Sequence, residues 1–179
     1  MNAGDVLGFW FETLEPKQWW QKDKELDLTI SERFGELHKK VSQGEYYEWR
    51  DTPEGSLAEI IVLDQFSRNI YRGSAEAFRY DGQALTLSQV AIDKGYDARL
   101  SQVERQFLYL PFMHSESKLI HQHAVRLFSQ LGDDYGYDFE LKHKAIIDRF
   151  GRYPHRNDAL NRQSTAEELE FLQQPGSSF

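Results

Sequence analysis

The stretch SLAEIIVLDQFSRN, residues 56–69, decides the fold that this sequence predicts. Its apolar side chains are spread around nearly the whole circumference of a helix: Leu57, Ala58, Ile60, Ile61, Val62, Leu63 and Phe66. A helix that is apolar on every side is one that the rest of the protein surrounds. We therefore expect this segment to be the centre of an all-α fold, with other helices packed against its faces.

Charged residues, Asp64 and Arg68 among them, interrupt this apolar helix. Asp64 and Arg68 lie four residues apart, so both side chains point to the same face. A buried charge without a partner costs several kcal/mol, so each of the two must be paired. They pair either with each other, which would tie the core together, or with the groups of a functional site. The sequence leaves these two alternatives open.

Further helices are indicated by apolar residues at three- and four-residue spacing and by capping residues. The pattern predicts about eight helices, no strand and a single domain over residues 1–179. The expected helices cover residues 5–14, 23–43, 56–69, 82–94, 101–111, 116–131, 138–150 and 164–172. No fixed-period repeat of a regular solenoid is present.

Composition limits the class of protein. Hydrophobic residues make up 40% of the chain, which is enough for a folded core, and the absence of cysteine excludes disulfides and a thiol nucleophile. No apolar run approaches the roughly 20 residues of a membrane span, and the first residues lack the basic stretch of a secretory signal. The net charge of -8 disfavours nucleic acid as a partner. We expect a soluble, cytoplasmic protein and leave its oligomeric state open.

The segment DRFGRYPHRNDALNRQST, residues 148–165, places four arginines beside histidine and asparagine in an acidic chain. Guanidinium groups hold carboxylates and phosphates through paired hydrogen bonds, so this density favours a site for a small anionic molecule. We expect the segment and the central helix to form two walls of one polar pocket. The candidate ligand-binding residues are Asp64, Gln65, Arg68, Asn69, Arg149, Arg152, His155, Arg156, Asn157 and Arg162.

Three residues are candidates for acid–base chemistry in this pocket, namely His114, Glu116 and His143. Imidazole titrates near neutral pH, and a neighbouring carboxylate can orient it. If the groups converge, they suit proton transfer or hydrolysis on an anionic substrate. A metal site is disfavoured because His121 and His123 are two residues apart and diverge on a helix. We therefore predict no metal and no cofactor.

Three motifs resemble those of a known family. They are LDQFSRNIYRG at residues 63–73, YLPFMHSES at residues 109–117 and FGRYPHRNDALNRQST at residues 150–165. Their order and spacing are similar to those of the domain of unknown function 924 family, over essentially the whole chain. The resemblance implies an all-α fold similar to the tetratricopeptide-like superfamily, in a soluble bacterial protein, and it implies no established activity.

Two residues depart from the pattern of this family. Ser67 stands where the resemblance leads us to expect proline, so the central helix should continue slightly further. Asn161 stands where glycine is expected, and it must adopt a turn conformation that asparagine tolerates better than most residues.

Two classes of function remain open. In the first, the polar pocket binds a small anionic ligand, with or without catalysis. In the second, a tetratricopeptide-like module binds a peptide or a protein, and the charged residues form a structural ion network. A groove wide enough for an extended peptide would favour the second class.

Overall fold

The computed structural model describes residues 1–178, and among them every regular element is helical. The all-α prediction is therefore confirmed. The chain divides into two units: Met1–Arg72 with Glu76–Pro111, and Gly73–Ala75 with the residues from Phe112 onward. The single domain that the sequence suggests stays a prediction.

The centre of the first unit is the apolar stretch quoted above. It forms α3 (Pro53–Ile61), a π-helical turn (Val62–Phe66) and α4 (Ser67–Ile70) in direct succession. Thr52 caps α3 by accepting a hydrogen bond from the Gly55 amide at 3.0 Å, so the helix begins earlier than predicted. The apolar side chains from 57 to 66 are at most 1% exposed, which confirms that this helix is buried on all sides.

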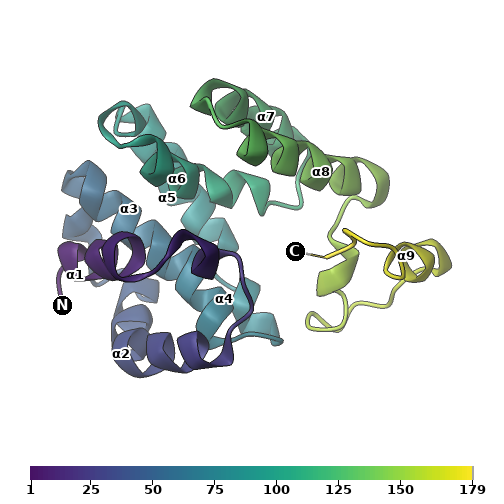
Figure 1. Ribbon diagram of the computed structural model, residues 1–179, viewed down its shortest axis with the longest axis horizontal. Coiled ribbons are helices and arrows are strands. Elements are labelled where there is room, and N and C mark those ends of the chain that lie inside the picture. The colour runs from purple at the N-terminus through teal and green to yellow at the C-terminus, as the bar shows by residue number, and fades with distance from the viewer. Residues whose placement is uncertain (179) are drawn as a thin grey trace. The chain divides into compact units, whose positions relative to one another are not determined.

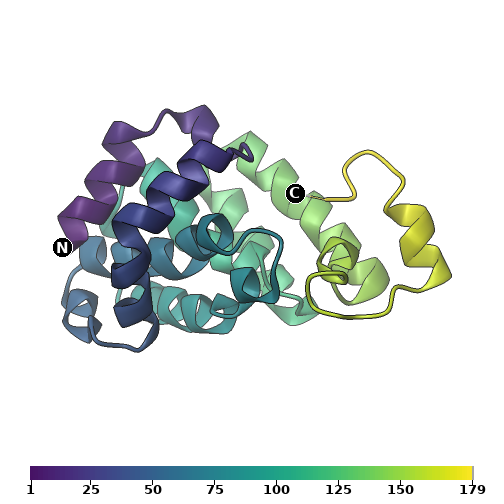
Figure 2. The same cartoon turned by 90° about the horizontal axis from the view of Figure 1, so that it is seen from below.

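Three helices pack against this segment (Figures 1 and 2). They are α1 (Ala3–Leu7), which a π-helical turn extends through Gly8–Thr13, α2 (Lys24–Ser42) and α5 (Asp81–Asp93). The inner face of α2 carries the expected stripe of buried residues. Its Phe34 ring lies 4.8 Å from the ring of Phe66, between ring centroids. The periodicity that predicted α2 therefore also predicted which face contacts the core.

The helix α6 (Gln102–Met113) begins with the expected capping box. The Ser101 amide donates to the Glu104 carboxylate at 2.8 Å, and the Glu104 amide donates to the Ser101 hydroxyl at 3.3 Å. We predicted that this helix ends at Pro111, which is wrong, because it continues to Met113. Proline removes one backbone hydrogen bond, but Leu110 and Met113 on either side are each 3% exposed, and their burial offsets that loss.

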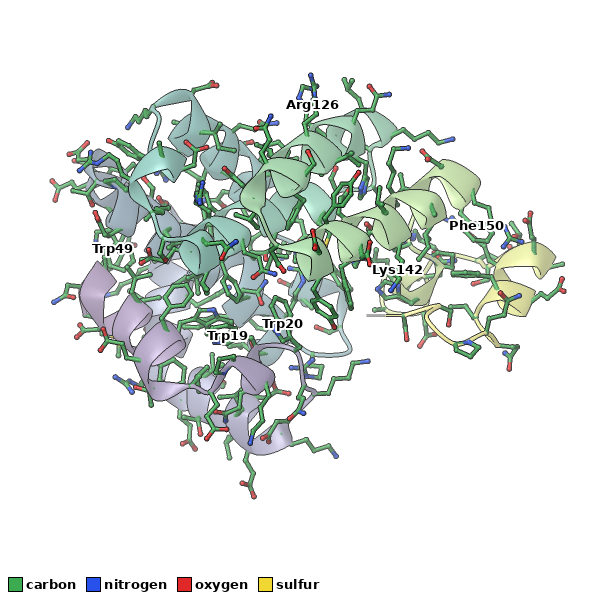
Figure 3. The ribbon with its side chains drawn as sticks, turned by 45° about the horizontal axis from the view of Figure 1, so that its top comes forward. Trp19, Trp20, Trp49, Arg126, Lys142 and Phe150 are labelled. Atoms are coloured by element: carbon green, nitrogen blue, oxygen red, sulfur yellow. The ribbon has the colours of Figure 1, made fainter. Side chains whose placement is uncertain are left out.

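An aromatic cluster joins the N-terminal segment to α6 within the first unit. The Trp19 and Trp20 rings lie 5.1 and 5.6 Å from the Phe107 ring, and Figure 3 shows the two indoles beside each other. The Trp19 indole donates to the Trp10 carbonyl at 2.8 Å, whereas Trp20 is half exposed. All four tryptophans of the sequence, including Trp49, belong to the first unit.

The second unit is built on a pair of helices. α7 (Lys118–Leu131) and α8 (Asp134–Phe150) are antiparallel neighbours, because only Gly132 and Asp133 connect them (Figure 1). A short 3₁₀ turn (Pro154–Arg156) and α9 (Ala166–Phe171) follow. Phe150, at the end of α8 and labelled in Figure 3, packs on Phe171 of α9 with ring centroids 5.0 Å apart.

Three predicted boundaries in this unit are wrong. Ser117 caps α7, so Glu116 lies in the preceding turn and not in the helix. Asp133 accepts hydrogen bonds from the Tyr135 and Gly136 amides, which starts α8 four residues before the predicted Asp138. Thr165, and not Ser164, caps α9. By contrast, Asn161 has a φ of 52°, which confirms its expected turn conformation.

Candidate functional site

The predicted site residues divide between the two units. Those on the central helix belong to the first unit: Asp64, Gln65, Arg68 and Asn69. The others belong to the second unit: His114, Glu116, His143, Arg149, Arg152, His155, Arg156, Asn157 and Arg162. The contacts within each unit show how these charges are satisfied.

Three of the four arginines in the segment 148–165 pair with glutamates of the second unit. The pairs are Arg149–Glu167 at 2.8 Å, Arg152–Glu168 at 2.7 Å and Arg162–Glu116 at 2.6 Å. Arg152 and Arg162 each bind both oxygens of their carboxylate, the geometry in which a guanidinium would hold an anionic ligand. The chain's own carboxylates therefore occupy these binding forks.

Glu116 is held on both oxygens. Arg162 donates two hydrogen bonds to it at 2.6 and 2.9 Å, and the Tyr153 amide donates a third at 2.7 Å. Burial alone would raise the pKa of Glu116, but the Arg162 guanidinium and the Tyr153 amide outweigh it and hold that pKa below its ordinary value. Glu116 is thus an ionised anchor for the loop, and its suggested role as partner of a catalytic histidine stays a prediction.

The fourth arginine of the segment, Arg156, is buried against backbone and ring. Its Nη2 donates to the His114 carbonyl at 3.0 Å, and its guanidinium carbon lies 4.6 Å from the centre of the Tyr153 ring. His155 stands beside the same ring, 5.6 Å away. Asn157 accepts a hydrogen bond from Arg162 Nε at 3.0 Å. These contacts are made within the second unit and stabilise the conformation of the segment 148–165.

A buried cluster in the second unit was missed from the sequence. His121 and Glu140 are fully buried, and Nδ1 of His121 lies 2.7 Å from Oε1 of Glu140. Its Nε2 lies 2.8 Å from the Ser115 carbonyl, which can only accept, so Nε2 carries a hydrogen. A further proton therefore lies between Nδ1 and Glu140, whose pKa is raised by burial. Glu140 lies three residues before the inward His143, which is the signal that could have revealed it.

His143 itself is a neutral ring. Burial lowers its pKa to about 3. Its Nδ1 lies 2.7 Å from the Phe139 carbonyl and carries the hydrogen of that contact. A ring with so low a pKa is a weak base at neutral pH.

On the central helix of the first unit, Arg68 joins two carboxylates. Its Nη1 lies 3.2 Å from Oδ1 of Asp64, so the predicted four-residue ion pair exists. The same guanidinium binds both oxygens of Asp81 at 2.9 and 3.0 Å. The Gln65 amide donates to Asp64 at 2.6 Å, and the Asn69 amide donates to Asp27 at 2.8 Å. These contacts tie α4 to α5 and α2.

The first unit also contains a cavity of about 520 Å³ between the C-terminal half of α2 and the segment 71–80. It is lined by Gly35, Glu36, His38, Lys39, Ser42, Gln43, Tyr71, Arg79 and Tyr80. We call this cavity the α2 groove. None of its residues was a candidate from the sequence, although His38 lies four residues after the inward Phe34 and three before the inward Val41.

His38, in the floor of the α2 groove, is 1% exposed and has a fixed tautomer. The Ser67 hydroxyl donates its single hydrogen to the Leu63 carbonyl at 2.6 Å. It must therefore accept the hydrogen of His38 Nε2, which lies 2.7 Å away. His38 Nδ1 is left as a bare acceptor, and among the described residues it has no hydrogen-bond partner.

The surroundings of His38 keep the ring neutral. Burial lowers its pKa to about 4. The rings of Tyr71 and Tyr80 stand 5.4 and 5.3 Å from the imidazole, both at steep angles to it. Burial, followed by the neighbouring Tyr80 and Glu76, also raises the pKa of Tyr71. His38, Tyr71 and Tyr80 thus form an uncharged aromatic part of the groove lining.

Gly35 lies inside α2, where glycine costs roughly 0.5–1 kcal/mol relative to alanine. A Cβ added to it would meet nothing within 4 Å, so no packing contact requires a glycine here. Because Gly35 has no side chain, the space of the α2 groove beside it stays open.

A family model described as a bacterial protein of unknown function, DUF924, matches residues 6–176. The chain belongs to this DUF924 family. A solved structure of a protein of unknown function from Agrobacterium tumefaciens is similar to it, with 37% sequence identity, 96% of each chain covered and a TM-score of 0.91. No curated protein matches the chain.

The first DUF924-like motif, residues 63–73, contributes to the α2 groove. Tyr71 lines the cavity, and Ser67 fixes the tautomer of His38. Ser67 is the position where we expected proline, which has no hydroxyl group to accept this hydrogen bond.

Two features are absent from residues 1–178. No helix in this range is long and apolar enough to cross a membrane. No group of three or more histidine, aspartate or glutamate side chains in the described part is placed to hold a metal ion.

Proposed function

We propose that this DUF924 protein acts in the cytoplasm and binds a small organic anion in the α2 groove of its first unit. The observation that carries the proposal is a cavity of about 520 Å³ whose lining includes Lys39, an exposed cation that has no ion pair with any described residue. The volume lies within the range of small-molecule sites.

The charge of the expected ligand follows from the cations that line the α2 groove. Arg79 is paired with Glu76 at 2.9 Å, whereas Lys39 is exposed and has no ion pair with any described residue. Glu36 is the one acidic residue in the lining. The charge of Lys39 therefore favours a ligand with an anionic group.

This proposal keeps the small anionic ligand that the sequence suggests and moves it away from the arginine-rich segment. Arg152 and Arg162 already hold carboxylates bidentately. Proton transfer or hydrolysis at His114, Glu116 and His143 has less support, because Glu116 is bound by Arg162 and His143 is a weak base. We therefore infer binding and assign no reaction.

The second candidate function is a tetratricopeptide-like interaction module, of which one part gains support. The arginine–glutamate pairs of the second unit favour the view that its charges are a structural ion network. For the first unit, a cavity lined by nine residues suits a small molecule better than an extended peptide.

The test uses Gly35→Leu as a steric block. Nothing lies within 4 Å of the added Cβ, so the variant should fold while its side chain fills the α2 groove. Gly82→Leu is the matched control, since Gly82 is an exposed helical glycine of α5 with equally open surroundings. A panel of small organic acids is screened by thermal shift and ligand-observed NMR. We expect binders that are lost in Gly35→Leu and retained in Gly82→Leu.

Two results would contradict the proposal. One is a panel without any binder to the wild-type protein. The other is a set of binders whose affinity is the same for wild type and Gly35→Leu.

A further inference from the structure

We propose that the ligand of the α2 groove is an amino acid, with its carboxylate bound by Lys39 and its ammonium group bound by Glu36. The inference rests on the proposed function and names the chemical class of its ligand, whose carboxylate is the anionic group expected there. It follows from two unpaired charges in the groove lining, from their spacing along α2 and from the rings beside them.

The α2 groove carries two opposite charges that the fold does not pair. Glu36 and Lys39 both line the cavity, and both side chains are exposed to solvent. Among the described residues neither side chain has an ion pair or a hydrogen bond, and they are not paired with each other. A carboxylate can only accept hydrogen bonds, and an ammonium group can only donate them. A ligand that satisfies both must therefore carry a donor, best a cationic one, close to its anionic group.

The spacing of the two residues suits a ligand whose own charges are close together. Glu36 and Lys39 are three residues apart on α2, and Cβ atoms at this spacing on a helix are about 5–6 Å apart. The ammonium group and the carboxylate of an α-amino acid are attached to one carbon atom, so the two side chains can bind them at the same time. Gln43, four residues after Lys39, also lines the groove, and its amide can bind either group.

A simple carboxylic acid fits these charges less well. Its carboxylate would be attracted by Lys39 but would lie near the carboxylate of Glu36, and no group of the acid would offset that repulsion. The other cation of the lining, Arg79, is already paired with Glu76. The two unpaired charges of the lining, one negative and one positive, thus match the two charges of an amino acid with an uncharged side chain.

The rings of the groove favour an apolar side chain on the ligand. Tyr71 and Tyr80 are half-buried and line the cavity, next to the buried ring of His38. Aromatic rings provide a large apolar surface, and they attract other rings in tilted and offset arrangements. Side chains such as those of leucine and phenylalanine would contact this part of the lining.

The experiment compares acids that differ only in the ammonium group. Binding of L-phenylalanine and 3-phenylpropionate, and of L-leucine and 4-methylpentanoate, to the full chain is measured by NMR titration at pH 7. We expect the amino acid of at least one pair to bind about threefold or more tightly than its deaminated partner, which is the scale of one partly exposed ion pair. The amine that lacks the carboxylate, 2-phenylethylamine or 3-methylbutylamine, should also bind more weakly than the corresponding amino acid.

Two variants that each remove one charge locate the contacts. In Glu36→Gln the preference for the amino acid over the simple acid should vanish, and in Lys39→Gln its advantage over the amine should vanish. Both residues are exposed, so both variants should fold. Glu32→Gln and Lys40→Gln are the matched controls, because these two residues of α2 are also exposed and do not line the groove. Both preferences should persist in the controls.

The failure of this inference can be told apart from the failure of the proposed function. If each simple acid binds as tightly as its amino counterpart, or if the preference persists in Glu36→Gln, the ligand class is overturned and the groove remains a binding site. The same follows if neither amino acid binds while other acids bind and Gly35→Leu abolishes their binding. If no acid, with or without an amino group, binds to the wild-type protein, the proposed function itself falls.

Discussion

In the second unit three of the four arginines of the segment 148–165 pair with carboxylates of their own unit. In the first unit, by contrast, Lys39 lines a cavity without an ion pair, and one nitrogen of the buried His38 has no hydrogen-bond partner among the described residues. The comparison shows that a high density of charged donors in the sequence does not by itself indicate a ligand site. The partners that the fold supplies decide which charges remain available.

The difference has a physical origin. A guanidinium and a carboxylate from the same chain are held at high effective concentration, so an external anion must displace the internal one. Lys39 in the α2 groove has no ion pair with a described residue, so an anion that binds there has no internal carboxylate to displace.

The contrast is tested most strongly by removing one partner of the buried pair in the second unit. His121→Leu leaves Glu140 buried without its partner, and we expect it to lower the free energy of unfolding by about 3–5 kcal/mol. The double variant His121→Leu/Glu140→Leu should recover most of that loss, because no buried charge remains. Urea denaturation followed by far-UV circular dichroism measures both. A loss below about 1 kcal/mol for the single variant would argue against a structural pair.

The ion network is tested next at Arg162. Arg162→Ala removes two hydrogen bonds to the half-buried Glu116, and we expect a loss of about 2–3 kcal/mol. Arg149→Ala is the control, since its ion pair with Glu167 is largely exposed and should contribute less than about 0.5 kcal/mol. Equal effects of the two variants in chemical denaturation would show that bidentate geometry at Glu116 is not what stabilises the loop.

Acid titration tests the first unit, in which Nδ1 of the buried His38 has no hydrogen-bond partner among the described residues. Burial lowers the pKa of His38 from 6.5 to about 4. Between these two pH values His38 is therefore protonated in the unfolded chain and neutral in the folded first unit. Stability is therefore fully present above about pH 6.5 and falls as the pH decreases toward 4, by about 2 kcal/mol between pH 7 and pH 5. Tryptophan fluorescence follows the first unit alone, because all four tryptophans are there. In His38→Phe this part of the pH dependence should disappear.

A smaller effect than that of His38 is expected at Gly35. Gly35→Ala should stabilise the first unit by about 0.5–1 kcal/mol, because it removes the cost of a glycine inside α2 without a clash. Thermal unfolding detected by tryptophan fluorescence measures the gain. If Gly35→Ala is less stable than the wild type, the empty space beside Gly35 is required for folding. A ligand would then not be the reason for a glycine at this position.

Much of the fold could be predicted from local patterns. The apolar circumference of residues 57–66 and the stripe of α2 identified the central helix and the face that packs on it. Asn161 adopts the expected left-handed turn because asparagine is one of the few residues that tolerates it. The misplaced starts of α7 and α8 have one cause: Ser117 and Asp133 are competing caps close to those expected.

Less of the candidate site could be predicted from the sequence. Whether Arg162 is satisfied depends on Glu116, 46 residues away, and no local pattern predicts that pairing. The tautomer of His38 depends on Ser67, 29 residues away, and on the direction in which one hydroxyl points. A pattern of residue types can locate charges. It cannot tell which of them the tertiary fold will leave without a partner.

The hydrogen shared by His121 and Glu140 has a consequence for the solution around the protein. In the unfolded chain the Glu140 carboxyl loses its hydrogen ion at its ordinary pKa. Burial raises that pKa in the folded second unit, so the carboxyl holds the hydrogen ion to a higher pH. At a pH just above the ordinary value, folding of this pair therefore takes up hydrogen ions, and a weakly buffered solution would register that uptake as a contribution toward alkaline pH.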